Sequence, residues 1–326
     1  MAVVAVTDHV FPHLEQERAM LAEAGHELRF DGNATTPNEV ADAVRGADAI
    51  LNCYTPIPVD VIRSLHGCRI IARYGIGLDT IDLAAATETG ILVTNVPDYC
   101  IDEVSDHALA LILSLARGVV RLDRQVHAGS WSPMDAAPLH RLRGRTLGLV
   151  GFGRIARTLA GKASAIGLRI LATDPFLPAD SIVEAGAEPC DLPTLLADAD
   201  VVSLHAPLTP ETHHMIGTEE LASMREGALL VNTSRGPLVD LDAVRASLAA
   251  GRLAGVALDV LETEPPAADD PLLSRADVIV TPHAAFYSEE SMAELQRKAA
   301  EQVIAALDGR VPPYAVNAEE LGLTWG

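Results

Sequence analysis

The residues that point most clearly to chemistry lie between Thr146 and Asp174. An apolar run, TLGLV, leads into a turn containing Gly151, Gly153 and Ala156, and a helical stretch and a second apolar run follow. Gly151 permits a tight turn, and Gly153 lets the backbone approach a pyrophosphate at the N-terminus of the helix. Asp174 lies where a carboxylate would accept hydrogen bonds from ribose hydroxyls. The order of these features predicts a dinucleotide-binding site. The structural alternative is a glycine turn followed by a surface aspartate.

The same segment predicts NAD rather than NADP. The phosphate of NADP would lie near Asp174, whose carboxylate repels it, and a nearby arginine would be needed to hold it. Residues 175–177 are Pro, Phe and Leu, and no lysine or arginine occurs between Arg169 and Arg225. We therefore expect NAD as the cofactor.

Three further runs stand where buried strands are expected to end, which is where ligands bind in an open parallel sheet. They are LLVNTSRGPLVD, GVALDVLETEPP and VIVTPHAAF. Together with RYGIGLDTIDL and the glycine-rich turn, they resemble the motifs of the D-isomer-specific 2-hydroxyacid dehydrogenases, in the same order and over nearly the whole chain. The runs RYGIGLDTIDLAAATETG, NVPDYCIDEVSDHALALIL and TPHAAFYSEES are most similar to the C-terminal-binding-protein branch of that family.

The resemblance implies that Arg235, Glu264 and His283 are the catalytic residues. A 2-keto acid presents a carboxylate and a carbonyl side by side, which a planar guanidinium can bind with two donors. A histidine titrates near neutral pH, so it can exchange the proton of the substrate oxygen while hydride moves at C2. A carboxylate on its other ring nitrogen orients the imidazole and stabilises its charged form. Without the resemblance, a loop cation, a solvated charge and a strand-end histidine would explain the same three residues.

The resemblance also implies residues that bind the substrate and the cofactor. The loop of residues 74–77 is similar to the segment whose backbone N–H groups hold the substrate carboxylate, although a plain glycine turn is the alternative. The substrate residues are Ile76, Gly77, Arg235 and Tyr54. The cofactor residues are Gly151, Gly153, Arg154, Ile155, Asp174, His205, Pro207, Thr212, Thr233, Ser234, Asp259 and Val104. For His205, structural packing is an equally simple explanation.

Three departures from the family pattern refine these expectations. Many relatives have Thr-Ala-Glu where this chain has Val104-Ser105-Asp106, so a hydroxyl contact to the cofactor is lost or replaced. Phosphite dehydrogenases carry a lysine where Ile76 stands, and formate dehydrogenases pair the histidine with a glutamine rather than with Glu264. Both substrates are therefore disfavoured.

The elements expected to position these residues form two α/β domains. In about the first 96 residues, five short apolar runs alternate with helical stretches, which predicts a flavodoxin-like parallel sheet covered on both faces. Residues from about Asp102 to Val126 should form one long helix, buried between domains or against another subunit. A second series begins at Thr146, and a last helix, from about Glu289 to Leu307, is expected to return to the first domain. We predict a substrate domain of residues 1–100 plus 288–326 and a Rossmann NAD-binding domain of residues 101–287, both doubly wound.

Composition restricts the partners. The 24 basic and 45 acidic residues give a net charge of −21, which disfavours nucleic acid and anionic membranes. The four cysteines show neither C-x-x-C spacing nor a zinc pattern, so we expect reduced structural thiols and no metal site. The N-terminus has no signal-peptide pattern and no apolar run reaches about 18 residues, so we expect a cytoplasmic protein without a membrane span.

Taken together, these features predict an NAD-dependent dehydrogenase that transfers hydride between the nicotinamide and C2 of a D-2-hydroxy acid or 2-keto acid. The alternative from another class is an NAD(H)-sensing scaffold of the corepressor type, with little or no turnover. Such scaffolds usually carry a disordered extension, whereas this chain is expected to end soon after its closing helix, at residues 321–326. The long apolar helix and the connector after it suggest a homodimer. Glycerate, lactate, glyoxylate and larger acids all remain open as substrates.

Overall fold

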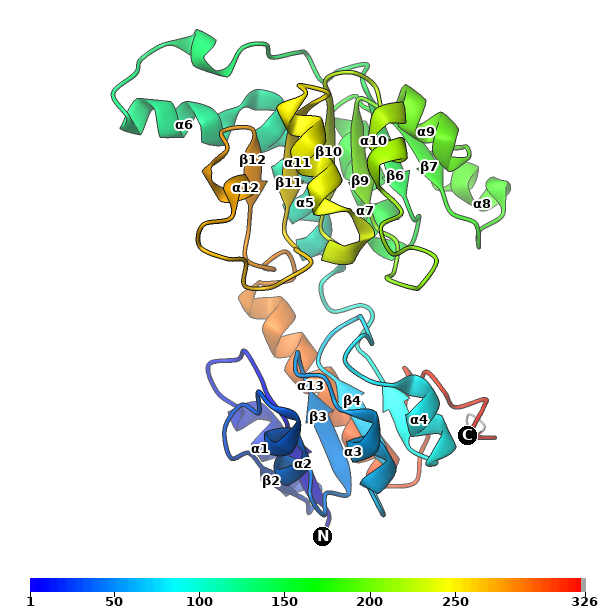
Figure 1. Cartoon of the computed structure of the whole chain (residues 1–326). Coiled ribbons are helices and arrows are strands. Elements are labelled where there is room, and N and C mark those ends of the chain that lie inside the picture. The colour runs from blue at the N-terminus through cyan, green and yellow to red at the C-terminus, as the bar shows by residue number, and fades with distance from the viewer. Residues whose placement is uncertain (324–326) are drawn as a thin grey trace. The chain divides into compact units, whose positions relative to one another are not determined.

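The structure is a computed structural model that describes residues 1–323, so the last three of residues 321–326, expected after the closing helix, lie outside it. The chain divides into two compact units (Figure 1). The first contains residues 1–100 and the segment from Ser288 onward, and the second contains residues 101–287. Among the described residues, no helix combines the length and apolar character needed to cross a membrane. The four cysteines are free thiols.

The first unit is a five-stranded parallel sheet with helices on both faces. Its strand order is β2-β1-β3-β4-β5, the flavodoxin-like order that the sequence predicts. Helices α2, α3 and α4 cover one face through an apolar cluster that includes Val40, Ile62 and Ala86, while α13 packs against β3 and β4 and also contacts α1. The strands are β1 (Val3–Val6), β2 (Glu27–Arg29), β3 (Ala49–Asn52), β4 (Ile70–Arg73) and β5 (Leu92–Thr94); the helices are α1 (Glu15–Glu23), α2 (Pro37–Ala43), α3 (Val59–Ser64), α4 (Leu83–Glu88) and α13 (Glu289–Leu307).

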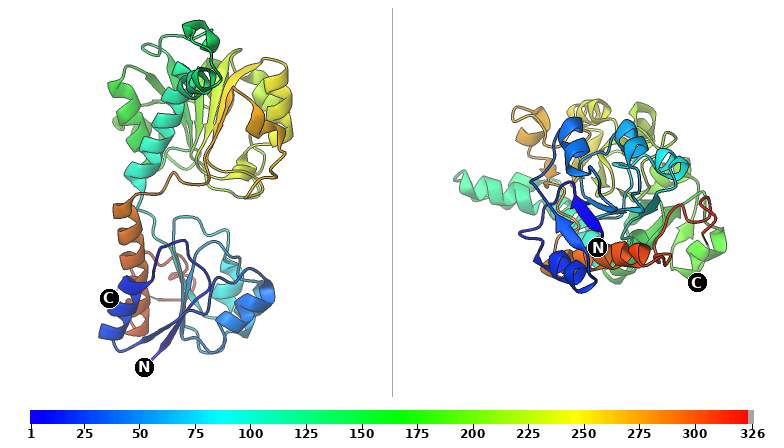
Figure 2. Two further views of the ribbon diagram at one scale, coloured as in Figure 1. Left: turned by 90° about the vertical axis from the view of Figure 1, so that its left-hand side faces the viewer. Right: turned by 90° about the horizontal axis from the view of Figure 1, so that it is seen from below.

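The second unit is a seven-stranded parallel sheet in the order β12-β11-β10-β9-β6-β7-β8. Counted from β6, this is the Rossmann order with one added strand at the β12 edge. Helices α5, α7 and α8 cover one face, and α9 to α12 cover the other (Figures 1 and 2). The strands are β6 (Thr146–Val150), β7 (Arg169–Thr173), β8 (Glu188–Pro189), β9 (Val201–Leu204), β10 (Ala228–Asn232), β11 (Leu253–Leu258) and β12 (Val278–Val280). The helices are α5 (Ile101–Arg117), α6 (Val119–His127), α7 (Arg154–Ala165), α8 (Ala179–Glu184), α9 (Leu192–Asp198), α10 (Thr218–Ser223), α11 (Leu241–Ala249) and α12 (Pro271–Ser274), with short 3-10 turns at Pro133–Ala136 and Gly236–Leu238.

The prediction of one long helix from about Asp102 to Val126 is wrong, because Gly118 separates α5 from α6. Gly118 has φ 60°, a left-handed conformation that ends α5, and a Cβ at this position would lie 2.7 Å from Cβ of Ala136. Helix α5 is buried along one side, but α6 has no buried residue in this chain and stands away from the sheet (Figures 1 and 2).

Candidate active site

The sites expected in the second unit gather at one edge of its sheet. Strands β6, β9, β10, β11 and β12 are neighbours and run parallel, so the residues that follow them meet at their common carboxyl edge. Those residues are Gly151 after β6, His205 after β9, Thr233 after β10, Asp259 after β11 and Thr281 after β12.

The glycine-rich turn after β6 has the geometry of a pyrophosphate cradle. Gly151 has φ 84°, and a Cβ there would lie 2.7 Å from the carbonyl carbon of His205, so only glycine fits. Gly153 is the N-cap of α7 without a side-chain cap, and a Cβ built on it meets no atom within 4 Å. The exposed Arg154 and half-buried Ile155 open the helix. An anion can therefore approach the first N–H groups of a twelve-residue helix, where the helix dipole favours it.

Asp174 lies directly after β7 and is fixed beside this turn. Its Oδ2 accepts a hydrogen bond from the N–H of Phe152 at 2.9 Å, and Oδ1 accepts one from the N–H of Phe176 at 3.0 Å. Each carboxylate oxygen has a second lone pair, which can accept from a ribose hydroxyl. Asp174 thus supports both the turn and the expected ribose contact.

The loop after β9 contains three expected cofactor residues, of which His205 is the most informative. Loss of hydration lowers the pKa of His205 to about 4, so its ring is neutral at physiological pH, and its Nε2 lies 2.9 Å from Oγ of Ser203. The hydroxyl of Thr212 donates to the carbonyl of Pro207 at 2.7 Å. Thr212 and Pro207 therefore close their own loop, and the hydroxyl of Thr212 has a structural role.

Two expected cofactor residues follow β10, and only one of them has a side-chain hydroxyl without a hydrogen-bond partner among the described residues. Oγ1 of Thr233 is buried, and no described residue provides it with a hydrogen-bond partner, as expected for a hydroxyl whose partner is a bound ligand. Ser234 instead donates through Oγ to the carbonyl of Leu204 at 2.8 Å.

At the start of α5, where the sequence departs from the family pattern, Val104 is buried and its polar neighbours contact α7. Lys162 of α7 places its Nζ 2.8 Å from Oγ of Ser105 and 2.7 Å from Oδ1 of Asp106. It also lies 3.3 Å from Oδ1 of Asp102. The polar side chains of this turn therefore fasten α5 to α7.

A histidine–carboxylate pair lies at the same edge. Nδ1 of His283 is 2.8 Å from Oε2 of Glu264, whose Oε1 accepts from the N–H of Leu261 at 2.9 Å. Partial burial alone would raise the pKa of Glu264, but the hydrogen bonds from His283 and Leu261 and the charges of His283 and Arg235 outweigh it and lower the pKa. Glu264 is therefore ionised and fixes a proton on Nδ1, so the proton exchange expected of His283 is assigned to Nε2.

Arg235 is brought toward this pair by the glycine that follows it. A Cβ on Gly236 would lie 2.0 Å from the carbonyl carbon of Leu261, so the loop after β10 passes against the loop after β11 only because residue 236 is glycine. The guanidinium of Arg235 is half-buried and donates to the carbonyl of Ser234 at 2.7 Å. The structure thus places all three expected catalytic residues at one edge of the second unit.

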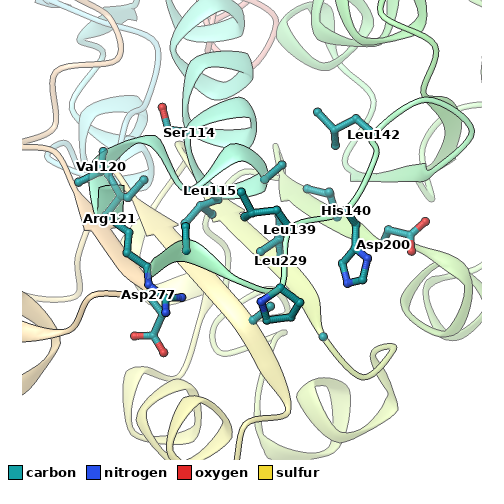
Figure 3. A pocket seen from close by; sticks show the side chains of 18 of the residues that line it. Ser114, Leu115, Val120, Arg121, Leu139, His140, Leu142, Asp200, Leu229 and Asp277 are labelled. Atoms are coloured by element: carbon teal, nitrogen blue, oxygen red, sulfur yellow. The ribbon is translucent and has the colours of Figure 1, made fainter. Parts of the chain in front are cut away.

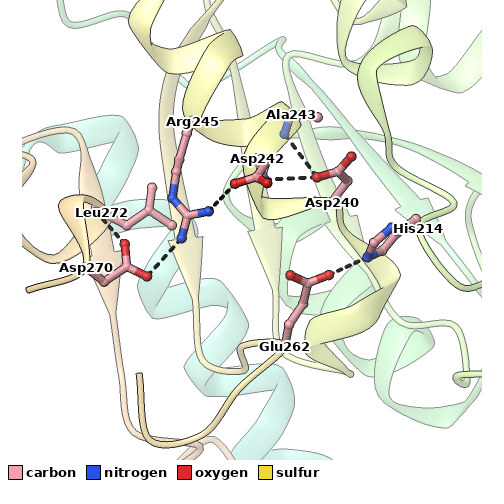
Figure 4. A network of polar contacts seen from close by, with 8 residues as sticks. All are labelled: His214, Asp240, Asp242, Ala243, Arg245, Glu262, Asp270 and Leu272. Carbon is pink, nitrogen blue, oxygen red and sulfur yellow. Dashed lines mark hydrogen bonds and ion pairs between the residues drawn. The ribbon is translucent and has the colours of Figure 1, made fainter. Parts of the chain in front are cut away.

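The loop that carries Glu264 is held on both sides (Figure 4). Nε2 of His214 makes a short hydrogen bond to Glu262, two residues before Glu264. On the other side, Arg245 of α11 bonds to Asp270 at 2.9 Å. Residues outside the expected set therefore hold the segment of residues 262–270, within which Glu264 lies.

The expected substrate loop lies in the first unit. The carbonyl of Ile76 accepts from Nδ2 of Asn95 at 2.7 Å, whereas the N–H groups of Ile76 and Gly77 have no acceptor among the described residues. The N–H of Tyr54 donates to the carboxylate of the buried Asp8 at 2.7 Å. These two N–H groups are available to a ligand such as a carboxylate.

The sequence reasoning missed Arg73, at the end of β4. This arginine is 8% exposed, no carboxylate among the described residues pairs with it, and its guanidinium lies 5.9 Å from the ring centre of Tyr54. A buried guanidinium without a counterion attracts an anion. The available signal was a single basic residue inside the apolar run RIIARY.

A cavity in the second unit lies at the opposite edge of the sheet (Figure 3). It is lined by residues that precede or begin strands, among them Asp200, Gly227 and Asp277, together with Leu115 of α5 and Arg121 of α6. Ligands in an open α/β sheet bind at the carboxyl edge, so this cavity is separate from the candidate active site.

A Rossmann nucleotide edge that also carries an arginine and a histidine–glutamate pair defines a dinucleotide-dependent dehydrogenase. Residues 109–285 match the family described as D-isomer specific 2-hydroxyacid dehydrogenase, NAD binding domain. The chain is 43% identical over 285 residues to a glyoxylate reductase of Korarchaeum cryptofilum, covering 86% of each chain. It is 36% identical over 301 residues to a glycerate dehydrogenase of Methylorubrum extorquens, covering 90% of this chain and 93% of the relative.

Solved structures of dehydrogenases are also similar to this chain. D-lactate dehydrogenase from Aquifex aeolicus, complexed with NAD and lactic acid, matches with a TM-score of 0.84 and 29% identity over 94% of this chain and 96% of that one. The chain belongs to the D-isomer-specific 2-hydroxyacid dehydrogenase family, and it is an NAD-dependent oxidoreductase of hydroxy and keto acids. The family, the fold class and the cofactor expected from the sequence are confirmed, and the scaffold alternative is not favoured. Placement in the C-terminal-binding-protein branch stays a prediction.

Proposed function

We propose that this enzyme reduces a short 2-keto acid of the glyoxylate type, with His283 as acid–base, Glu264 as its orienting partner and Arg235 as the substrate-binding cation. The observation that carries the proposal is the 2.8 Å contact between Nδ1 of His283 and Glu264 at the carboxyl edge that also holds Arg235. Names of relatives that reduce glyoxylate or act on glycerate support a short acid.

The proton steps follow from the geometry of the pair. When bound, NADH supplies a hydride to C2 of the keto acid. His283 keeps one proton on Nδ1, bonded to Glu264, and delivers the other from Nε2 to the oxygen on C2. In the oxidative direction Nε2 accepts that proton, and the ionised Glu264 stabilises the imidazolium that forms.

Substrate binding is assigned to donors that do not titrate near neutral pH. Arg235 offers two parallel N–H donors in one plane, which match a carboxylate or a carboxylate next to a carbonyl. We assign the free N–H groups of Ile76 and Gly77 to the substrate carboxylate, as the family resemblance implies. The buried charge of Arg73 favours the same anion. Tyr54 and Phe286, whose ring centre lies 6.2 Å from that of His283, are assigned to the substrate side chain.

The enzyme is further proposed to be a cytoplasmic homodimer that binds neither nucleic acid nor membranes. Apolar side chains on and after α6 are exposed in this chain: Val119 by 54%, Val126 by 45%, Trp131 by 89% and Met134 by 70%. A patch of this kind is typical of a protein interface. Free cysteines and the charge of −21 support the location and the absence of polyanionic partners.

The test is steady-state reduction of glyoxylate with NADH, together with NADH affinity. His283→Ala should lower kcat by about two to four powers of ten and leave NADH affinity near normal. Arg235→Lys keeps the charge but loses the two parallel donors of the guanidinium, so the transition state should lose about 2–5 kcal/mol of stabilisation. The value of kcat/KM should therefore fall roughly 30- to 5,000-fold, mainly through a higher KM for the keto acid.

A matched control is Arg45→Lys, which changes an exposed arginine of the first unit. Cofactor binding without turnover of any keto acid in the wild type would favour the scaffold alternative. If Arg235→Lys weakened only NADH binding, Arg235 would be a cofactor residue and the substrate assignment would be wrong.

A further inference from the structure

The backbone of His283 is in an unfavourable conformation that its surroundings must maintain. Its φ of 52° lies in the left-handed region, which side chains with a Cβ rarely adopt. The N–H of His283 donates to the carbonyl of Asp259 at 2.8 Å. The next two N–H groups, of Ala284 and Ala285, donate to Oδ1 and Oδ2 of the same aspartate at 2.9 Å each. Asp259 therefore determines the course of the turn that carries His283.

The carboxylate of Asp259 depends in turn on its neighbours. It is 1% exposed, and a buried carboxylate is stable only when it is well hydrogen-bonded or paired. Besides the two N–H groups, the hydroxyl of Thr281 donates to Oδ1 at 2.6 Å. Within residues 1–323, the basic side chain at ion-pair distance is His107 of α5, whose Nε2 lies 3.6 Å from Oδ1.

The hydrogen-bond donors and acceptors around Thr281 assign a donor role to His107. Its Nε2 lies 3.0 Å from Oγ1 of Thr281. The hydroxyl of Thr281 has a single proton, and it is donated to Oδ1 of Asp259. Oγ1 can then only accept from His107, so Nε2 of His107 carries a proton. The result is a directed chain of hydrogen bonds from His107 through Thr281 to Asp259.

His107 itself comes from a rigid element. Its neighbours on α5, Ala108, Leu111 and Ile112, are buried in the cluster that packs the helix against β10 and β11. Strand β11 ends at the residue before Asp259. The donor and the carboxylate are therefore fixed on packed elements, which is what holding a catalytic turn requires.

We propose that His107 is a positioning residue for His283, acting through Thr281 and Asp259 on the turn of residues 281–285. His107 does not touch the reacting atoms in this scheme. The inference rests on the proposed acid–base role of His283. A displacement of about 1 Å at a reacting group costs up to roughly 100-fold in rate, so loosening this turn should lower kcat much more than it changes substrate or cofactor affinity.

Three variants separate positioning from general stability. His107→Leu removes the donor, His107→Gln keeps an N–H donor near the position of Nε2, and Thr281→Val breaks the link to Asp259. The control is His66→Leu, the same replacement at an exposed histidine of the first unit. If His107→Leu does not fold, His107→Asn, which is polar but too short to reach Thr281, replaces it. The readouts are kcat, KM for glyoxylate, NADH affinity and the ¹H NMR shift of the His283 ring.

We expect His107→Leu to lower kcat by roughly 10- to 100-fold with KM and NADH affinity within about twofold, and to move the His283 resonance. His107→Gln should stay within about threefold of wild type, and His107→Leu should add little to Thr281→Val, since both break one chain. Unchanged kcat in His107→Leu, equal damage in His107→Gln, multiplying effects or a loss confined to NADH affinity would each overturn the inference. An active His283→Ala variant would instead refute the proposed function itself.

Discussion

Replacing Glu264 by glutamine tests the histidine–glutamate pair at its centre. The carboxylate accepts two hydrogen bonds, from Nδ1 of His283 at 2.8 Å and from the N–H of Leu261 at 2.9 Å. An amide has one oxygen and one NH₂ group. The amide of Glu264→Gln either presents its NH₂ group to the N–H of Leu261, donor against donor, or turns it toward Nδ1 of His283, which must then accept and give up the proton that Glu264 fixes there.

The structure sets different magnitudes for stability and for turnover. The side chains of His283 and Glu264 are 27% and 37% exposed, and an ion pair this accessible contributes about 0–1 kcal/mol to the free energy of unfolding. Catalysis loses more, because the imidazolium is charged in the acid–base step and its charge-assisted hydrogen bond is worth about 1.5–3 kcal/mol. That range corresponds to a loss of about 10- to 150-fold in kcat.

The assay is glyoxylate reduction and its reverse, the thermal unfolding midpoint and NADH affinity, measured for Glu264→Gln and for Glu219→Gln, an exposed control on α10. We expect a large loss in kcat for the first variant only, with unfolding and NADH affinity nearly unchanged in both. Turnover within about twofold of wild type in Glu264→Gln would show that the carboxylate neither orients His283 nor stabilises its charge.

Three further outcomes are expected. The pKa of His205 is about 4 in the folded chain, against an ordinary value of 6.5. Between these pH values the unfolded chain binds a proton that the folded chain does not, so the free energy of unfolding should fall by about 3 kcal/mol as the pH drops from 6.5 to 4. Urea denaturation at pH 7 and 4.5 should show a smaller fall in His205→Asn. Asp174→Ala with Phe176→Arg should weaken NAD and improve NADP in KM measurements, because a repelling carboxylate is lost and a phosphate donor is gained. The fully buried carboxylate of Glu17 accepts a hydrogen bond from the Tyr74 hydroxyl at 2.9 Å, and Glu17→Gln replaces it with an amide. The unfolding midpoint of this variant should fall by an amount equivalent to about 1–3 kcal/mol, and an unchanged midpoint would contradict this.

The fold was largely predictable because its signals are local. The strand from Thr146 to Val150 and the helix from Glu289 to Leu307 have the predicted bounds, since apolar period, caps and turn residues all lie within each segment. The one wrong element also had a local signal: Gly118 interrupts an otherwise helical pattern, and the continuous apolar character around it favoured a single helix. A Cβ at this position would also lie 2.7 Å from Cβ of Ala136, a contact outside the helix that the local pattern does not reveal.

The sequence predicted candidate reacting groups but not the residues that support them. Arg235, Glu264 and His283 stand in motifs that resemblance identifies. Asp259 was expected at the cofactor, yet its carboxylate is occupied by the turn of residues 281–285, and Arg73 shows its burial only once β4 is inside the sheet. Such roles depend on contacts between segments far apart in the chain.

The contacts that hold the turn of residues 281–285 share one physical reason. The 2.8 Å contact between His283 and Glu264 joins two separate loops, so its geometry is only as exact as the less rigid of them. The left-handed backbone of His283 costs on the order of 1–3 kcal/mol. Three hydrogen bonds to Asp259, each worth about 1 kcal/mol, offset a cost of that size. The margin is small, so a weakened Asp259 carboxylate would let the turn relax while the rest of the sheet stays folded. Activity should therefore respond to changes in this network that hardly affect unfolding.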